Sequence, residues 1–494
     1  MSTDQQAAAE AGSSGERQRT FFGHPWGLAN LAGVEMWERF SFYGMQAILV
    51  YYLYYSVTEG GLGLTEASAT SIVGAYGGLV YLSAILGAWV ADRLFGAERT
   101  LTGAAVLIMF GHISLAVFPG LVGVGIGLIC VAVGSGTLKA TTSSVLGDMY
   151  ARDDERRDGG FSIYYMGVNL GALVGPLLTG ALWGWRGFHW GFGLAAVGMA
   201  IGLTQYLLMR RSTIGDAGKE VTNPLDRAGR IKYGLIAAGV VALIVILSLV
   251  GVITATRLSN IVVGITLAAA VALFAIMLTS KNIDTAERHR VQSFIPMFAA
   301  SAIFWSLFQQ QFTVVAVYAD QRLNLNIGGW TMSPSWVQSI NPIFIIIFAG
   351  VFAAMWTKLG PRQPTTPIKF ALGTIIMGVA FLLFLPYANG GPDSTPLLWL
   401  VLILFCFTMA ELFLSPVGQS LSTKLAPRAF HTQMIALFFL SIAVGTAGAG
   451  SLARFYDPTN ESPYFAFLGG ASIVMGIALI LGRKAISRLM EGVR

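Results

Sequence analysis

Three ionisable side chains stand close together in an apolar segment near the N-terminus: Glu35, Glu38 and Arg39. Their spacings of three and four residues would place them on one face of a helix. Two carboxylates beside one guanidinium leave one acid without a full partner, so this acid could bind and release a proton. A structural ion cluster that joins two helices is the alternative. Three charges on one buried face exceed what packing needs, so we expect the group to face a cavity.

Lys139 and Glu411 are isolated ionisable residues in two other apolar segments. Lys139 is nine residues from Asp148, or about 13 Å along a helix, which is beyond the reach of a lysine side chain. Its ammonium group needs an internal partner, either a carboxylate of the first group or a substrate carboxylate. Glu411 could receive a cationic amine or hydrogen-bond to a neighbouring helix. Pro416 and Gly418 are expected to break the helix of this glutamate just beyond it.

Amide side chains occur in two further apolar segments, as Gln309 and Gln310 in one and Asn341 in the next. Amides can bind both ends of a peptide bond, and they also join helices to one another. The two buried cations could meet a carboxylate while the isolated glutamate meets an ammonium group. This combination suits a short zwitterion that contains peptide bonds. Tyr81 and Phe438, by residue type alone, are more often packing residues than pocket lining.

The sequence contains no Ser/His/Asp arrangement, no nucleotide-binding loop and no metal-ligand spacing. We therefore expect no enzyme activity, no cofactor and no ATP-driven transport by this chain. An ion gradient remains as the energy source for transport, and buried carboxylates favour protons as the coupling ion.

The composition indicates the class of protein that must position these residues. Of 494 residues, 55% are hydrophobic and only 11% are charged, whereas soluble proteins carry about 25% charged residues. The basic residues behind the net charge of +6 are scattered between apolar segments, so we expect no nucleic-acid partner. The low share of charged residues excludes a soluble enzyme, and the chain is predicted to be an all-α polytopic membrane protein.

A membrane-spanning helix needs about 20 mostly apolar residues. The sequence contains fourteen such runs, near residues 27–55, 69–90, 98–118, 121–147, 160–182, 189–209, 233–254, 258–280, 293–318, 335–357, 367–387, 396–416, 431–453 and 463–483. With the N-terminus inside, 25 of the 31 Lys and Arg residues fall in cytoplasmic segments and four fall outside. The chain is therefore predicted to cross the cell inner (plasma) membrane many times, with both termini cytoplasmic.

The order of the segments predicts four regions. We expect a disordered cytoplasmic tail (1–20), an N-terminal six-helix bundle (21–211), a linker with two extra membrane helices (212–290) and a C-terminal six-helix bundle (291–494). The two extra helices contain no interior charge, so they are predicted to face lipid outside the functional core. Parallel six-helix repeats are typical of transporters that rock two bundles about a central site.

Four stretches resemble the signatures of one transporter family. The stretch from Glu35 to Gly44 resembles the ExxERFxYYG motif of the proton-dependent oligopeptide transporter (POT/PTR) family of bacteria, in the major facilitator superfamily. The stretches 161–173, 335–342 and 411–418 are similar to further signatures of that family. The resemblance implies a major facilitator fold with two inserted helices. It also implies symport of protons with di- and tripeptides by alternating access.

The same resemblance implies roles for individual residues. Glu35, Glu38, Arg39 and Lys139 would take part in proton coupling. The groups around the peptide C-terminus would be Arg39, Tyr43, Lys139 and Asn341, and those near its amine would be Asn169 and Glu411. The pocket would be lined by Tyr81, Trp305, Ser415 and Phe438, and we add Gln309 and Gln310 because of their amides.

The chain departs from the family pattern at three places. Ala140-Thr141 replace a usual Pro-Asn, Phe42 replaces a tyrosine, and Gln309 replaces an acid commonly tied to proton movement. An uncoupled facilitator, or a member that carries amino acids or nitrate, is therefore an alternative. A membrane sensor without transport activity would need a signalling domain that the sequence does not show. We expect a monomer, because the fold needs no partner.

Overall fold

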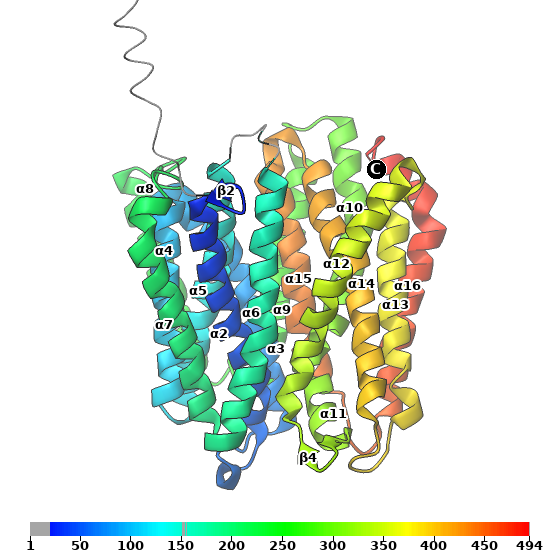
Figure 1. The fold of residues 1–494 in the computed structure, drawn as a ribbon. Helices are drawn as coiled ribbons and strands as arrows, with labels where there is room; N and C mark the ends of the chain where they lie inside the picture. The colour runs from blue at the N-terminus through cyan, green and yellow to red at the C-terminus, as the bar shows by residue number, and fades with distance from the viewer. Residues whose placement is uncertain (1–19, 151–153, 155, 494) are drawn as a thin grey trace, which may run out of the picture.

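The computed structural model describes residues 20–150, 154 and 156–493. The predicted tail (1–20) therefore lies outside the described residues, except for Thr20. Fourteen long helices are described (Figure 1): α2 (Trp26–Tyr54), α3 (Glu66–Val90), α4 (Ala97–Val117), α5 (Gly120–Asp148), α6 (Arg157–Arg186), α7 (Phe188–Thr213), α8 (Arg227–Leu249), α9 (Leu258–Thr279), α10 (Thr285–Phe308), α12 (Ile340–Leu359), α13 (Thr366–Leu382), α14 (Leu397–Lys424), α15 (His431–Ala453) and α16 (Ser462–Leu489). A short helix, α11 (Val314–Arg322), follows α10.

The only strands among the described residues form two short antiparallel hairpins. β1 (Thr20–Phe21) pairs with β2 (His24–Pro25), so that Thr20 faces Pro25. β3 (Asn326–Ile327) pairs with β4 (Trp330–Thr331). The prediction of an all-α membrane fold is confirmed, since helices form all the rest of the described regular structure.

Thirteen of the described helical segments are long and apolar enough to span a membrane. The segment of α2 is not among them, although its 29 residues suffice in length. Its interior carries ionisable and amide side chains, which lower its hydropathy. Together the thirteen and α2 coincide with the fourteen predicted spans.

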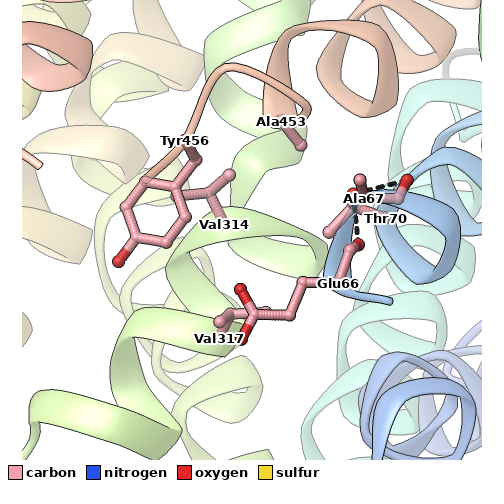
Figure 2. Close-up of a pocket in the computed structure, with 7 residues that line it drawn as sticks. All are labelled: Glu66, Ala67, Thr70, Val314, Val317, Ala453 and Tyr456. Atoms are coloured by element: carbon pink, nitrogen blue, oxygen red, sulfur yellow. Dashed lines mark hydrogen bonds between the residues drawn. The ribbon is translucent and has the colours of Figure 1, made fainter. Parts of the chain in front are cut away.

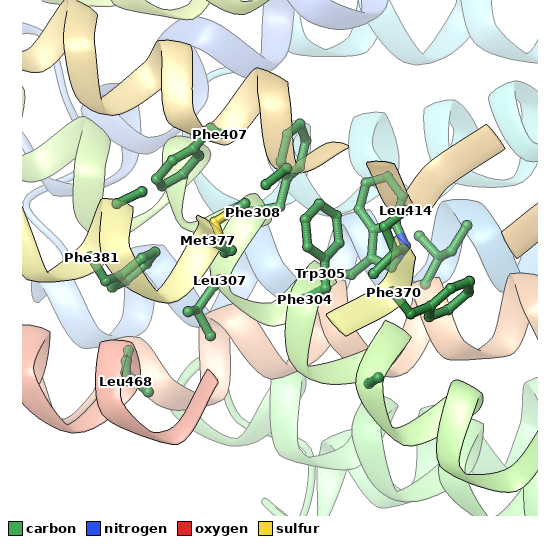
Figure 3. Close-up of a cluster of buried hydrophobic side chains, with 14 of the residues drawn as sticks. Phe304, Trp305, Leu307, Phe308, Phe370, Met377, Phe381, Phe407, Leu414 and Leu468 are labelled. Atoms are coloured by element: carbon green, nitrogen blue, oxygen red, sulfur yellow. The ribbon is translucent and has the colours of Figure 1, made fainter. Parts of the chain in front are cut away.

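The long helices form two bundles side by side, and both described ends of the chain lie at one end of the molecule (Figure 1). Helices α2 to α7 pack against one another in the N-terminal bundle, and α10 and α12 to α16 do so in the C-terminal bundle. The C-terminal bundle has an aromatic core (Figure 3). In it, Phe304 stacks on Phe308 and Phe381 stacks on Phe407, with ring centroids 5.8 Å and 5.7 Å apart. The predicted bundle boundaries at 211 and 291 fall inside the last turn of α7 and inside α10.

Helices α3 and α15 make the most extensive contact between the two bundles. Their backbones approach closely at glycines: a Cβ atom added to Gly74 would lie 2.6 Å from the Cα atom of Gly450. A Cβ atom added to Gly78 would lie 2.8 Å from that of Ala447. Small residues at helix crossings in membranes allow such close packing.

We expect Gly74→Ala to lower the thermal stability of the protein in detergent. The added methyl group would push α3 away from α15, and overpacking of this kind typically costs about 1–3 kcal/mol. The matched control is Gly103→Ala on α4, because a Cβ atom there meets nothing within 4 Å. Equal unfolding temperatures for the two variants would contradict the role of this crossing.

The two inserted helices, α8 and α9, differ in how much of their surface packs against the bundles. Every residue of α8 except Gly229 and Leu247 is exposed, as predicted for a helix outside the core. Helix α9 instead packs on α3 and α15, where the Ser259 hydroxyl lies 3.1 Å from that of Ser71 and 3.2 Å from that of Ser451. Helix α9 therefore contacts both bundles, which the prediction of a lipid-facing insertion did not include. Its serine and threonine residues are spaced so that one face is buried, which the absence of interior charge did not reveal.

The position of the helix break also differs from the prediction. Helix α14 continues through Pro416, which membrane helices tolerate because neighbouring groups satisfy the freed carbonyl. The ninth predicted span is broken instead: α10 ends at Phe308, a 3₁₀ turn covers Gln309–Phe312, and α11 begins at Val314. Thr313 leaves helical geometry, with φ −123° and ψ −101°. The side chain of Gln310 stabilises this break, because it donates to the carbonyl of Ala449 and accepts from the Thr313 hydroxyl.

Candidate functional site

The charged group of α2 is buried, and one guanidinium serves both acids. The Nε atom of Arg39 lies 2.9 Å from an Oε atom of Glu35 and 2.9 Å from one of Glu38. All three side chains are at most 6% exposed. The structure therefore confirms that they share one face of the helix, as their spacing predicts.

Several buried polar atoms around this group have no hydrogen-bond partner among the described residues. They include the second oxygen of Glu35, one oxygen of Glu38 and the Nη2 atom of Arg39. Buried polar atoms normally find partners, so such a cluster indicates a place where a proton or a ligand binds. The charged group therefore retains unused hydrogen-bonding capacity beyond its own ion pairs.

Lys139 of α5 lies close to this group and makes no ion pair shorter than 4 Å with any described residue. Its Nζ atom instead sits 5.0 Å from the ring centroid of Tyr81, in a cation–π contact. The charges of Arg39, Glu35, Glu38 and Glu411 all act on it. A static salt bridge, the alternative left open by the sequence, is thus not formed here, and the ammonium group remains available to an anion.

Glu411 of α14 and Asn341 of α12 form the opposite side of the site. The Asn341 Nδ2 atom donates to Oε2 of Glu411 at 3.2 Å and to the Thr408 hydroxyl at 3.0 Å. The resemblance grouped Asn341 with the cations around a peptide C-terminus, but the structure pairs it directly with the acid. Because only the Nδ2 atom of Asn341 is used in these bonds, its side-chain carbonyl oxygen can accept a hydrogen bond from a ligand.

Tyr43 links the two sides. It lies one turn after Arg39 on α2, and its ring stacks on Phe312 of the C-terminal bundle at 6.2 Å. The charge of Glu411 acts on Tyr43 and Tyr81 as well as on Lys139. Arg39 and Lys139 on one bundle therefore face Glu411 on the other, and we call these three residues with Tyr43, Tyr81 and Asn341 the central site.

Three predicted site residues, Trp305, Gln309 and Gln310, lie at the end of α10 and in the 3₁₀ turn that follows it. Gln310 is fully buried, and both ends of its amide make hydrogen bonds inside the C-terminal bundle. Gln309 is buried at the start of the 3₁₀ turn. Trp305 packs edge-on against Phe304 and Phe308, and its buried indole N–H has no partner among the described residues. Of the three, only Gln310 has a side-chain hydrogen bond to another described residue.

Three further predicted residues lie on other helices. The amide of Asn169 on α6 donates to the carbonyl of Tyr165 in its own helix at 2.9 Å. Ser415 on α14 is half-buried, one turn after Glu411. Phe438 belongs to the core of the C-terminal bundle and packs over Gly418, which leaves room for its ring. Phe438 therefore packs in this core, and its predicted place in the pocket lining stays a prediction.

Sequence reasoning missed several aromatic and hydroxyl residues of the central site. Ser135 of α5 lies near Glu38, Tyr164 of α6 lies near Glu35, and the charge of Glu411 acts on Tyr165. Tyr76 of α3 stacks on Phe42 at 5.8 Å. Only helical spacing could have indicated them: Ser135 precedes Lys139 by one turn, and Tyr165 precedes Asn169 by one turn.

One end of the molecule is closed by contacts between the bundles. We call it the gate end; it holds residues 55–65 and 323–333, opposite the termini, at the bottom of Figure 1. There Tyr54, the last residue of α2, and Tyr55, which follows it, both donate to the carboxylate of Asp320 on α11, the latter at 2.7 Å. The Tyr51 hydroxyl donates to the carbonyl of Ala316 at 3.2 Å. Helix α11 is therefore held against α2 of the other bundle.

Further hydrogen bonds strengthen the same closure. Gln321 donates to Glu66 at 2.7 Å, and the indole of Trp336 donates to the carbonyl of Leu177 at 3.0 Å. A cavity of about 30 Å³ remains between α3, α11 and α15 (Figure 2), lined by Glu66, Ala67, Thr70, Val314, Val317, Ala453 and Tyr456. This space holds roughly one or two water molecules and is too small for a peptide. The contacts between α3, α11 and α15 therefore leave little open space at the gate end.

We expect the double variant Tyr54→Phe/Tyr55→Phe to loosen the gate end. It removes two hydrogen bonds to a carboxylate, each worth about 1.5–3 kcal/mol. The measurement is the rate of thiol labelling at Ala316→Cys in detergent, with Cys130 and Cys406 replaced by alanine. Labelling should rise by roughly tenfold or more. The control is Tyr233→Phe on exposed α8; labelling that stays unchanged in the double variant would show that the tyrosines do not hold the gate.

No group of three or more His, Cys, Asp or Glu side chains among residues 20–150, 154 and 156–493 could hold a metal ion. The central site instead offers two cations, one acid, one amide and two phenol hydroxyls. Such an arrangement has the chemistry to bind a small molecule that carries both an anionic and a cationic group.

The chain is similar to known transporters over nearly its whole length. A model of the POT family matches residues 98–469. An uncharacterized transporter of Bacillus subtilis, YclF, is 45% identical over 96% of this chain and 97% of the relative. A di-/tripeptide transporter of Lactococcus lactis subsp. cremoris is 40% identical over 97% of this chain and 99% of the relative.

Solved structures agree with the sequence relatives. A mutant of the peptide transporter POT in complex with alafosfalin has a TM-score of 0.91 and 46% identity, with 100% of both chains covered. The fold, the residues of the central site and these similarities lead to one conclusion. The chain belongs to the POT family of membrane transporters.

Proposed function

We propose that this protein is a proton-coupled symporter that imports di- and tripeptides by alternating access. One observation carries the proposal: Arg39 and Lys139 of one bundle face Glu411 of the other across the central site. The di-/tripeptide transporter of Lactococcus lactis supports the choice of substrate.

The central site suits the two ends of a short peptide. The peptide carboxylate would bind Arg39 and Lys139, since the Nη2 atom of Arg39 and the ammonium group of Lys139 have no described hydrogen-bond partner. The peptide ammonium group would bind Glu411, whose Oε2 atom already accepts from Asn341. Opposite charges on opposite bundles favour peptides short enough to bridge them, and the bound peptide draws the bundles together.

Proton coupling follows from the shared guanidinium of Arg39. While Arg39 pairs with both Glu35 and Glu38, neither acid needs a proton. A peptide carboxylate that binds Arg39 competes with these acids for the same cation. The acid that loses its partner then takes up a proton, because a buried unpaired carboxylate is costly. Peptide and proton would thus bind together and leave together.

The proposal includes an orientation and an energy source. We infer that both termini are cytoplasmic in the cell inner membrane, because 25 of 31 Lys and Arg residues lie on that side of the spans. The gate end would then face outward and close behind a bound peptide. We also propose that the protein acts as a monomer, without a bound cofactor. One charge that moves through 100 mV supplies about 2.3 kcal/mol, enough for roughly fifty-fold accumulation of a neutral substrate.

An uncoupled facilitator is the second candidate, because Gln309 stands where the family pattern has an acid. One experiment distinguishes the two: uptake of labelled di-alanine into proteoliposomes under an imposed pH gradient, with and without a protonophore. We expect accumulation above equilibrium that the protonophore abolishes. Uptake that only equilibrates would favour the facilitator, and absence of uptake would exclude peptide transport.

The variant Glu38→Gln tests the coupling itself. It should lose gradient-driven accumulation but retain exchange of labelled for unlabelled di-alanine, because exchange needs no net proton movement. Accumulation that matches the unaltered protein would exclude Glu38 as the proton carrier.

A further inference from the structure

A groove opens at the end of the molecule opposite the gate end, between the start of α13 and the last turns of α16. Its cavity measures about 390 Å³ and is lined by Thr365, Ile368, Arg483, Lys484, Ser487 and Arg488. We call it the α13–α16 groove. It lies on the C-terminal bundle, away from the central site, so its role does not depend on the proposed transport function.

The groove concentrates positive charge without any acid in its lining. Arg483, Lys484 and Arg488 are exposed, and none of them forms an ion pair with another described residue. Glu491, which follows on the same stretch of chain, is already paired with His289 at 2.8 Å. Three unpaired cations around one cavity attract an anion with more than one charged or polar oxygen.

Two hydroxyl groups complete the lining. Thr365 precedes the first turn of α13 but its side chain makes no capping hydrogen bond. Ser487 also makes no hydrogen bond to another described side chain or carbonyl, so both hydroxyls can donate to a ligand. Guanidinium, ammonium and hydroxyl donors together are the usual ligands of a phosphate group.

An apolar stripe leads from the groove along the outer face of α16. Val474, Ile477 and Leu481 are 66%, 46% and 80% exposed. Their spacings of three and four residues put them on one face of the helix, and Lys484 and Arg488 continue that face. A hydrocarbon chain could therefore lie along the stripe while its charged headgroup occupies the groove.

We propose that the α13–α16 groove binds the phosphate headgroup of an anionic phospholipid, with an acyl chain along Val474, Ile477 and Leu481. Basic pockets between membrane helices bind such headgroups, and anionic lipids are attracted by each nearby Lys or Arg. Free phosphate shares the headgroup chemistry. The apolar stripe favours the lipid, because a free ion would gain nothing from it.

The test measures which lipid the full-length purified protein retains. Native mass spectrometry follows the protein in micelles with an equimolar mixture of phosphatidylglycerol and phosphatidylcholine. We expect phosphatidylglycerol to be enriched about fivefold or more in the unaltered protein, because about 1 kcal/mol, the attraction of a single cation, already gives fivefold. The triple variant Arg483→Gln/Lys484→Gln/Arg488→Gln should lose this enrichment.

A matched control separates the groove from general surface charge. The triple variant Arg227→Gln/Arg230→Gln/Lys232→Gln removes the same charge from the start of exposed α8, and it should keep the enrichment. Equal losses in both triple variants would overturn the proposal in favour of general electrostatic attraction. Unchanged enrichment in the α16 variant would also overturn it.

Two further measurements test the hydroxyl groups and the source of the phosphate. Thr365→Ala/Ser487→Ala keeps all charges and should lower the enrichment at least twofold, as expected for lost hydrogen bonds. If the triple variant does not fold, Lys484→Gln alone should still lower the enrichment measurably. Millimolar inorganic phosphate should not displace the lipid; displacement would identify the groove as a site for free phosphate.

Discussion

Arg39→Gln is expected to lower gradient-driven uptake of di-alanine by roughly a hundredfold or more. The substitution leaves Glu35 and Glu38 buried without their shared cation, which lies 2.9 Å from each. Removal of one partner from a buried ion pair typically costs about 3–5 kcal/mol. The same change removes a guanidinium that the peptide carboxylate would bind. Uptake into proteoliposomes measures the combined effect.

The controls separate transport from folding. Arg454→Gln, at an exposed position after α15, should behave like the unaltered protein. The double variant Glu38→Gln/Arg39→Gln removes one of the two unpaired carboxylates, so it should regain thermal stability without regaining uptake. Arg39→Lys should give partial uptake, because a single ammonium group cannot bridge two carboxylates as a planar guanidinium does. Uptake by Arg39→Gln within about threefold of normal would contradict a central role for Arg39.

Glu411→Gln is expected to lower uptake of di-alanine by roughly ten- to a hundredfold, and that of N-acetylated di-alanine far less. A hydrogen bond to a charged group contributes about 1.5–3 kcal/mol, and only the free peptide carries the ammonium group that Glu411 would bind. The glutamine carbonyl can still accept from Asn341, so the local structure should persist. Competition of both compounds for labelled di-alanine uptake measures the difference.

The matched control for this prediction is Glu220→Gln, which removes an exposed acid from the linker before α8. It should change neither uptake. If Glu411→Gln weakens the free and the acetylated peptide equally, then Glu411 does not bind the amine and serves only to hold Asn341 and Thr408 in place.

The fold was largely predictable because a membrane restricts what a chain can do. Each span must satisfy its backbone hydrogen bonds internally, so an apolar run of about 20 residues becomes a helix. The fourteen predicted runs accordingly coincide with helices, apart from the break between α10 and α11. That break depends on Gln310, which bonds to Ala449 far along the chain, and no local pattern reports such a contact.

The residues of the central site were partly predictable for a related reason. Charges in an apolar span are so costly that Glu35, Glu38, Arg39, Lys139 and Glu411 could be singled out one by one. Neutral residues carry no such signal. Ser135, Tyr76 and Tyr164 were therefore missed. The sequence also did not reveal that Gln310 hydrogen-bonds within the C-terminal bundle.

The sequence by itself determined the class of protein, the number of spans, the ionisable residues inside them and the resemblance to one transporter family. Hydropathy and local motifs suffice for these, since they depend on a residue and its near neighbours. Only the tertiary structure decided which groups meet. It paired Asn341 with Glu411, placed Lys139 on the ring of Tyr81, packed α9 between the bundles and joined Tyr54 and Tyr55 to Asp320. These contacts join residues far apart in the chain, and packing in three dimensions alone selects them.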